Sequence, residues 1–178
     1  MLDVLRDQGV VATFFLIGEN AVRYPQLARR IHREGHALGN HGWTHKRLDQ
    51  ISRTEVQNEI LKGAQAIRRA TGVRPRILRP PYGAVDRRLA GPTGLAAQLD
   101  QRIVMWSVET RDWSTRSALQ VAAGTVRRVE PGAVVLLHDG GGNREHVVTA
   151  TRWMVGHLAR KGYRFVTVPE LLAMAQRQ

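Results

Sequence analysis

The chain has 178 residues and a mass of 19.9 kDa, the size of one domain with a buried core. It contains no cysteine, which excludes disulfides and thiolate metal sites and leaves the redox compartment open. The formal net charge is +12, but the basic residues are spread over separate segments without interleaved aromatics. We therefore expect solvated helix faces with a weak preference for anionic partners, and no nucleic-acid partner. No transmembrane segment or leader sequence is expected after Met1.

The first part of the chain alternates between helix-like and strand-like patterns. We expect an opening helix at residues 2–8 and then a buried strand at residues 10–17, rich in β-branched and aromatic side chains, which Gly18 ends. A helix at residues 21–34 and a short strand at residues 37–39 follow. This order favours parallel strands joined by helices.

The next helix has clear local signals at both ends. Ser52 and Glu55 have the spacing of a capping box, in which each side chain accepts a hydrogen bond from the other residue's backbone N–H. Gly72 is expected to close this helix. A short strand at residues 77–78 then leads into two prolines, and a weakly patterned helix is expected near residues 85–99.

The remaining segments continue the alternation of strand and helix. The terminal helix is expected to start at Pro169, because a missing N–H does no harm in a first helical turn. Such alternation is typical of a parallel barrel or of a doubly wound sheet. Since a barrel unit starts with its strand, the opening helix indicates that the strand expected before it is missing from this sequence. The expected elements are a strand at 102–108, a helix at 117–129, a strand at 133–137, a helix at 146–160 and a strand at 163–167.

Four segments with unusual side chains follow expected strands, at the edge where catalytic groups gather in barrels. In the first, His41 and His45 lie four residues apart, so their imidazoles can face one divalent metal ion. Two surface histidines in a polar loop are the alternative. The second, residues 79–83, reads Arg-Pro-Pro-Tyr-Gly, a stiff loop that can present a backbone N–H to an oxyanion. Its alternative is a structural turn.

The other two segments carry carboxylates, tryptophans and a histidine. Residues 106–113 hold two tryptophans and two carboxylates, a composition that suits a sugar site, although core tryptophans are equally common. His138 ends an apolar strand and precedes three glycines, which suits a general acid or base. A buried histidine with satisfied hydrogen bonds is the alternative.

Taken together, these segments resemble the carbohydrate esterase family 4 polysaccharide deacetylases, also called the NodB-homology domain. The framing sequences at residues 10–18 and 162–167 match as well, and the resemblance covers residues 1–178 with four of the family's five motifs. It implies one domain with an α/β fold, a distorted parallel (β/α) barrel of the polysaccharide deacetylase type, missing its first strand.

The resemblance also implies metal-dependent hydrolysis of acetyl groups, with N-acetyl expected ahead of O-acetyl. The substrate would be a polysaccharide such as peptidoglycan, a chitin-type oligomer or an exopolysaccharide. The expected cofactor is a divalent metal, Zn²⁺ above all. The residues that match family positions are His41 and His45 as metal ligands, His138 as general acid, Asp112 as the carboxylate that tunes it, Arg79 as the partner of the catalytic base, Tyr82 as the oxyanion donor through its backbone N–H, and Trp113, Leu136 and Pro81 around the substrate.

The family's first motif, Thr-Phe-Asp-Asp-Gly-Pro, does not occur in this sequence. In the family it supplies the catalytic base and the third protein ligand of the metal, so we expect weak zinc binding and negligible activity for the chain as written. A catalytically inactive glycan-binding relative is one alternative, and a basic domain that binds polyanions is another. The resemblance implies a secreted or cell-envelope location and a monomer.

Overall fold

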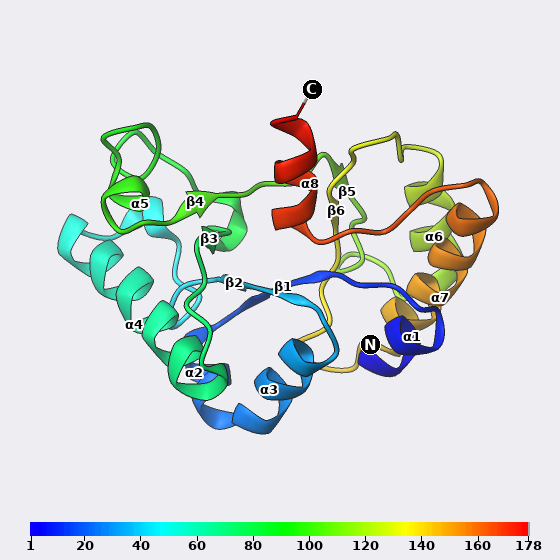
Figure 1. Ribbon diagram of the computed structural model, residues 1–178, viewed down its shortest axis with the longest axis horizontal. Coiled ribbons are helices and arrows are strands. Elements are labelled where there is room, and N and C mark those ends of the chain that lie inside the picture. The colour runs from blue at the N-terminus through cyan, green and yellow to red at the C-terminus, as the bar shows by residue number, and fades with distance from the viewer. Residues whose placement is uncertain (178) are drawn as a thin grey trace. The chain divides into compact units, whose positions relative to one another are not determined.

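The computed structural model describes residues 1–177 and divides into two compact units. Unit 1 consists of Met1–Ala12 together with the chain from Trp106 onward, and unit 2 is Thr13–Met105. Each unit has a parallel sheet accompanied by helices, which confirms the expected α/β class (Figure 1). Within the described residues, no helix combines the length and the apolar character that crossing a membrane requires.

Unit 2 is built on a four-stranded parallel sheet in the order β1-β2-β3-β4. In β1 and β2, Phe14 lies opposite Leu38, and β2 and β3 meet where Asn40 faces Leu78. Because the strands are parallel, their carboxyl ends share one edge, and His41 and Arg79 both follow strands at that edge. The strands are β1 Thr13–Leu16, β2 Ala37–Asn40, β3 Ile77–Leu78 and β4 Arg102–Ile103; the helices are α2 Gly18–Arg23, α3 Pro25–Arg33, α4 Arg53–Thr71 and α5 Leu95–Gln98, with 3₁₀ turns η1 Leu48–Gln50 and η2 Pro81–Gly83.

The single helix expected at residues 21–34 is wrong, because the structure has α2 and α3 in its place. The break falls at Tyr24, whose φ of −129° and ψ of 58° lie outside the helical region. Pro25 explains it, since its ring disfavours helical geometry in the preceding residue and its nitrogen has no hydrogen to donate. Proline in the first turn of α3 costs nothing. The first strand is also shorter than expected, starting at Thr13.

Helix α4 begins and ends as its sequence predicts. The Glu55 N–H donates to Ser52 Oγ at 3.3 Å, and the Ser52 N–H donates to Glu55 Oε2 at 3.0 Å, which is a complete capping box. Gly72 closes the helix with a left-handed φ of 80°. The apolar face of α4, with Val56 and Ile60, joins the buried core of unit 2.

Replacing Ser52 by Ala should lower the free energy of unfolding by about 1 kcal/mol, because one helix N–H would lose its side-chain acceptor. Urea unfolding followed by circular dichroism measures the change. Thr54→Ala, at an exposed position in the same first turn, is the matched control and should cost nothing. Equal losses in the two variants would contradict a role for the cap.

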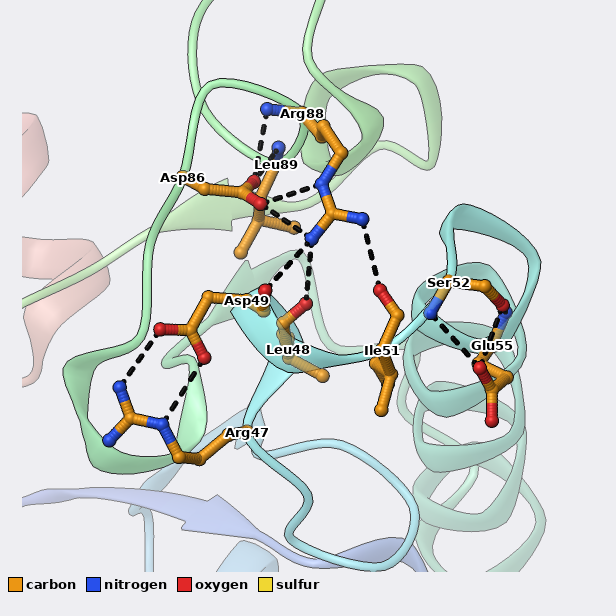
Figure 2. A network of polar contacts seen from close by, with 9 residues as sticks. All are labelled: Arg47, Leu48, Asp49, Ile51, Ser52, Glu55, Asp86, Arg88 and Leu89. Atoms are coloured by element: carbon orange, nitrogen blue, oxygen red, sulfur yellow. Dashed lines mark hydrogen bonds and ion pairs between the residues drawn. The ribbon is translucent and has the colours of Figure 1, made fainter.

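The helix expected near residues 85–99 is wrong over most of its length, where the structure has turns and only the short α5. Glycines and a proline at residues 91–94 interrupt it. A polar network holds this segment instead (Figure 2). Asp86 Oδ1 accepts the backbone N–H groups of Arg88 and Leu89, each at 3.0 Å, and the Arg88 guanidinium donates to the Ile51 carbonyl at 3.0 Å. The segment is thereby tied to the chain just before α4.

Unit 1 contains a two-stranded parallel sheet in which Val108 lies opposite Val135. Helices α6 and α7 pack side by side around Val121 and Met154, and α1 lies against α7 (Figure 1). The elements are α1 Leu2–Asp7, β5 Val108–Glu109, α6 Ala118–Val126, β6 Val135–Leu136, α7 Glu145–Arg160 and α8 Val168–Ala175.

Two strand predictions in this part of the chain are wrong. The strand expected at residues 102–108 is split into β4 and β5, because the chain changes partner: the Val104 N–H donates to Leu78, and the Ser107 N–H donates to Val134. Residues 163–167 are assigned to neither sheet among the described residues, since alternating apolar side chains favour extended backbone but do not supply a neighbouring strand. The terminal helix begins at Val168, with Pro169 in its first turn as expected.

Candidate active site

The turn after β2, residues 41–45, brings His41 and His45 together and is called the histidine turn below. Their Nε2 atoms are 3.2 Å apart, and their ring centroids are separated by 4.8 Å. In a tetrahedral zinc site with Zn–N bonds of about 2.0–2.1 Å, two ligand nitrogens lie about 3.3 Å apart. The pair therefore has a spacing that suits two ligands on one zinc ion, and the same 3.2 Å is also the length of a hydrogen bond between the two rings.

The protonation of His41 also suits a metal ligand. Its Nδ1 atom lies 2.5 Å from the Arg79 carbonyl oxygen. Because a carbonyl oxygen can only accept, Nδ1 must carry the proton, and Nε2 keeps the lone pair that a metal needs. This contact links the histidine turn to the loop after β3.

The donor set is incomplete for a full zinc site. Over residues 1–177, no group of three or more His, Cys, Asp or Glu side chains is placed to hold one metal ion. His41 and His45 fit two positions of a tetrahedral site by donor type and spacing, and further ligands would have to complete it.

Arg79 is buried, with 8% of its surface exposed. Its guanidinium donates to the carbonyls of Val104 at 3.3 Å and Met105 at 3.0 Å, and it lies 4.1 Å above the ring of Phe15. Burial lowers the pKa of Arg79 to about 10, so the side chain stays charged at neutral pH. These contacts give Arg79 a place in the core of unit 2 as well as beside the histidine turn.

The Pro-Pro-Tyr loop places Tyr82 next to the histidine pair. Tyr82 has a left-handed φ of 59°, a strained conformation of the kind found at functional sites. The residue is 62% exposed, and its ring lies 4.7 Å from the ring of His45 and 5.8 Å from the guanidinium of Arg47. Pro81 is buried beneath this turn, so it shapes the loop from the inside.

In unit 1, Asp112 and His138 form a hydrogen-bonded pair. The His138 Nδ1–H donates to Asp112 Oδ1 at 2.8 Å, and the His138 backbone N–H donates to Asp112 Oδ2 at 2.7 Å. The Asp112 side chain is fully buried, whereas that of His138 is 40% exposed. With Nδ1 committed to Asp112, Nε2 is the ring nitrogen that can exchange a proton with a substrate.

Neighbouring groups fix the charge and position of Asp112. Burial alone would raise the pKa of this carboxyl, but hydrogen bonds from the side chain and backbone of His138 and from Thr110 outweigh burial and hold its pKa below the usual value. His146, on α7, lies with Nε2 3.0 Å from the Asp112 carbonyl oxygen. Thr110 and His146 were not predicted as site residues, because nothing in the sequence around them indicates a contact with Asp112.

The lowered pKa of Asp112 predicts an acid-dependent contribution to stability. Ionised Asp112 stabilises the fold above the unfolded-chain pKa of about 3.9, and this contribution is lost as the pH falls through the lower folded-state pKa. The difference in unfolding free energy between the parent and Asp112→Asn should therefore shrink below about pH 4. Urea titrations across this range measure it, with the exposed Asp3→Asn as control. A difference independent of pH would contradict the assignment.

The remaining predicted site residues lie in unit 1. Trp113 directly follows Asp112 and is 60% exposed, so its face is open to a ligand. Leu136, in β6, is buried with 7% exposed. The structure thus gathers the predicted residues into two clusters, one in each unit: His41, His45, Arg79, Pro81 and Tyr82 in unit 2, and Asp112, Trp113, Leu136 and His138 in unit 1.

Glu59 contacts the histidine turn and was not predicted as a site residue. It lies on α4, is buried, and accepts hydrogen bonds from the backbone N–H groups of Trp43 and Thr44. A signal was present in the sequence: Glu59 lies on the same face of its helix as Val56 and Ile60, where an apolar residue is expected.

Comparison with known proteins identifies the family. The family model described as polysaccharide deacetylase matches residues 1–102, and the chain belongs to this family. Over 172 residues it is 38% identical to a peptidoglycan-N-acetylglucosamine deacetylase of Bacillus cereus, covering 96% of this chain and 62% of that protein. Over 186 residues it is 35% identical to a chitooligosaccharide deacetylase of Bradyrhizobium sp., covering 96% of this chain and 82% of that protein. The chain therefore spans less than two thirds of the Bacillus cereus relative.

Solved structures of the same family share the fold. A peptidoglycan N-acetylglucosamine deacetylase matches with a TM-score of 0.90 and 36% identity, covering 96% of this chain and 78% of that one. A CE4-family pseudoenzyme from Bacillus anthracis matches with a TM-score of 0.87 and 28% identity, covering 96% of this chain and 58% of that one. The fold expected from the sequence is thus confirmed.

Proposed function

We propose that this chain is the deacetylase part of a hydrolase that removes acetyl groups, N-acetyl above all, from a polysaccharide. The observation that carries the proposal is the His41–His45 pair, with Nε2 atoms 3.2 Å apart and His41 Nδ1 committed to the Arg79 carbonyl. Membership of the polysaccharide deacetylase family supports it.

His41 and His45 are the residues that would hold the metal ion, with zinc as the expected ion. When bound, such an ion supplies Lewis-acid activation of the acetyl carbonyl and lowers the pKa of a water molecule. The chain's own contribution is to present two neutral imidazoles toward one point. The Arg79 carbonyl secures the tautomer of the first, and the Tyr82 ring packs against the second.

His138, held by Asp112, would donate a proton to the leaving amine. Asp112 holds the imidazole through Nδ1, so Nε2 is the ring nitrogen that can deliver a proton as the C–N bond breaks. Among the other matched residues, Tyr82 would donate its backbone N–H to the oxyanion, and Arg79 would orient the carboxylate base. In unit 1, Trp113 and Leu136 would contact or support the substrate, and in unit 2 Pro81 would support the loop that carries Tyr82.

The relatives point to the substrate class. One is named for peptidoglycan N-acetylglucosamine and another for chitooligosaccharide, so the shared chemistry is an N-acetylated hexosamine in a glycan. We propose the same class of substrate for this chain, with the cell envelope or the secreted fraction as its location and a monomer as the acting species.

A direct test measures zinc binding and acetate release together. The chain is incubated with Zn²⁺ and N-acetylglucosamine oligomers, alone and after extension at residue 1 by a segment containing Thr-Phe-Asp-Asp-Gly-Pro. We expect zinc binding in both forms, tighter in the extended one, and acetate release only in the extended one, because a base and a third ligand are then supplied. A chain that binds no zinc in either form would refute the proposal.

A second candidate is a glycan-binding relative without turnover. Over residues 1–177 no third metal ligand joins the histidine pair, and one solved relative is described as a pseudoenzyme. This candidate predicts affinity for chitin oligomers, reduced by Trp113→Ala, with no acetate released even by the extended form.

A further inference from the structure

Glu59 is a carboxylate in an unusual place. It is 6% exposed, on the face of α4 that packs toward the turn carrying the two histidines. Its Oε2 atom accepts the backbone N–H of Trp43 at 2.9 Å and that of Thr44 at 2.8 Å, and its Oε1 atom accepts the Thr44 hydroxyl at 2.7 Å. A buried charge with three donors is held firmly, because each bond is charge-assisted and none competes with bulk water.

The turn needs such an anchor because its backbone is strained. His45 has a left-handed φ of 69°, which is unfavourable for a residue with a β-carbon. That conformation turns the His45 ring back toward His41, where the two Nε2 atoms come within 3.2 Å. Such a conformation persists only where surrounding contacts hold the backbone in place. Glu59 supplies two of these contacts, because it binds the N–H groups of the two residues just before His45.

The helix and the turn are also in direct backbone contact. A β-carbon added at Gly63, one turn after Glu59, would lie 2.6 Å from the Gly42 carbonyl oxygen, so only glycine allows this approach. Asn40 adds a second link, because its Nδ2 donates to the Ile60 carbonyl at 2.9 Å and its Oδ1 accepts the Gly42 N–H at 3.1 Å. The turn is therefore fixed to α4 from both ends, with Glu59 at the end nearest His45.

We propose that Glu59 is a positioning residue: its carboxylate holds the Trp43–Thr44 backbone so that His41 and His45 keep the separation required by one metal ion. This inference rests on the proposed metal site. It differs from a role in folding alone, because a folding role would lower stability without changing the zinc affinity of the folded protein.

The experiment measures the affinity of the full chain for Zn²⁺ alone, by competition with a chromophoric chelator, beside its stability in urea. Glu59→Leu removes all three acceptors and should weaken zinc binding by about 10–100-fold, the usual loss when a residue that orients a metal ligand is removed. Glu59→Gln keeps an oxygen for the two backbone N–H groups, so its zinc affinity should stay within about threefold of the parent, a smaller loss than the roughly 10–100-fold expected for Glu59→Leu.

The matched control is Glu55→Leu, the same substitution one turn earlier on the same helix, where the carboxylate serves only the Ser52 capping box. It should lower stability and leave the zinc affinity unchanged. If Glu59→Leu does not fold, Thr44→Val tests the same anchor, because it removes only the bond to Oε1 and should still weaken binding measurably.

The outcomes separate the two claims. A parent chain that binds no zinc refutes the metal site and this inference with it. A parent chain that binds zinc, with folded Glu59→Leu or Thr44→Val variants of equal affinity, overturns the positioning role alone and leaves the metal site standing.

Discussion

His41→Ala should weaken zinc binding by the chain more than about 100-fold, beyond the 10–100-fold range that follows from disturbing a residue behind a metal ligand. The reason is the number of donors. Two Nε2 atoms 3.2 Å apart can share one ion, whereas a single imidazole would leave the ion with only one of these two protein nitrogens. The loss should be the same for His45→Ala, because each ring supplies one of the two nitrogens.

The control for this prediction is His32→Ala, which removes an exposed imidazole from α3 in the same unit. Both variants are compared with the parent by chelator competition at neutral pH, and by urea unfolding to show that they are folded. Equal affinities in His41→Ala and His32→Ala would mean that the ion is held elsewhere. A loss in both would point to non-specific binding by surface histidines.

His138→Ala should lower the rate of acetate release by about 10²–10⁴-fold in the form extended by the Thr-Phe-Asp-Asp-Gly-Pro segment. The imidazole is needed when the leaving amine takes a proton, so the loss should fall on kcat with little change in KM. Asp112→Asn should also lower kcat, because both carboxylate oxygens accept hydrogen bonds from His138 and an amide has only one acceptor oxygen.

The control here is His157→Ala on α7, which removes a partly buried histidine from the same unit without touching Asp112. Acetate is measured by a coupled assay on N-acetylglucosamine oligomers. Turnover of His138→Ala within a factor of a few of the control would assign the acid to another group. A rise in KM with unchanged kcat would make His138 a binding residue.

Local signals predicted part of the fold well. Helix α4 was predicted with both ends, because its capping box and its closing glycine act within a few residues. Residues 163–167 show the opposite case: their pattern favours extended backbone, but membership of a sheet depends on a neighbour elsewhere in the chain. The break at Tyr24 had a local cause in Pro25, which the apolar spacing of the segment concealed.

The candidate site also has features that sequence spacing predicted and features that depend on contacts between distant segments. The pairing of His41 with His45 was predicted from their spacing, because four residues bring two side chains to one side of a turn. The contribution of Glu59 depends on α4 packing against that turn, through contacts across 15 and 16 positions that no short pattern encodes. The contact between the Arg79 carbonyl and His41 is likewise set by strand order.

The division of the chain into units has a consequence for synthesis on the ribosome. Unit 2 is one uninterrupted stretch, Thr13–Met105, so every strand of its four-stranded sheet has emerged before translation ends. Unit 1 joins Met1–Ala12 to the chain from Trp106 onward, and α1 must wait for α7, its packing partner, to be translated. The apolar face of α1, with Leu2, Val4 and Leu5, is thus without its packing partner until α7 has been translated.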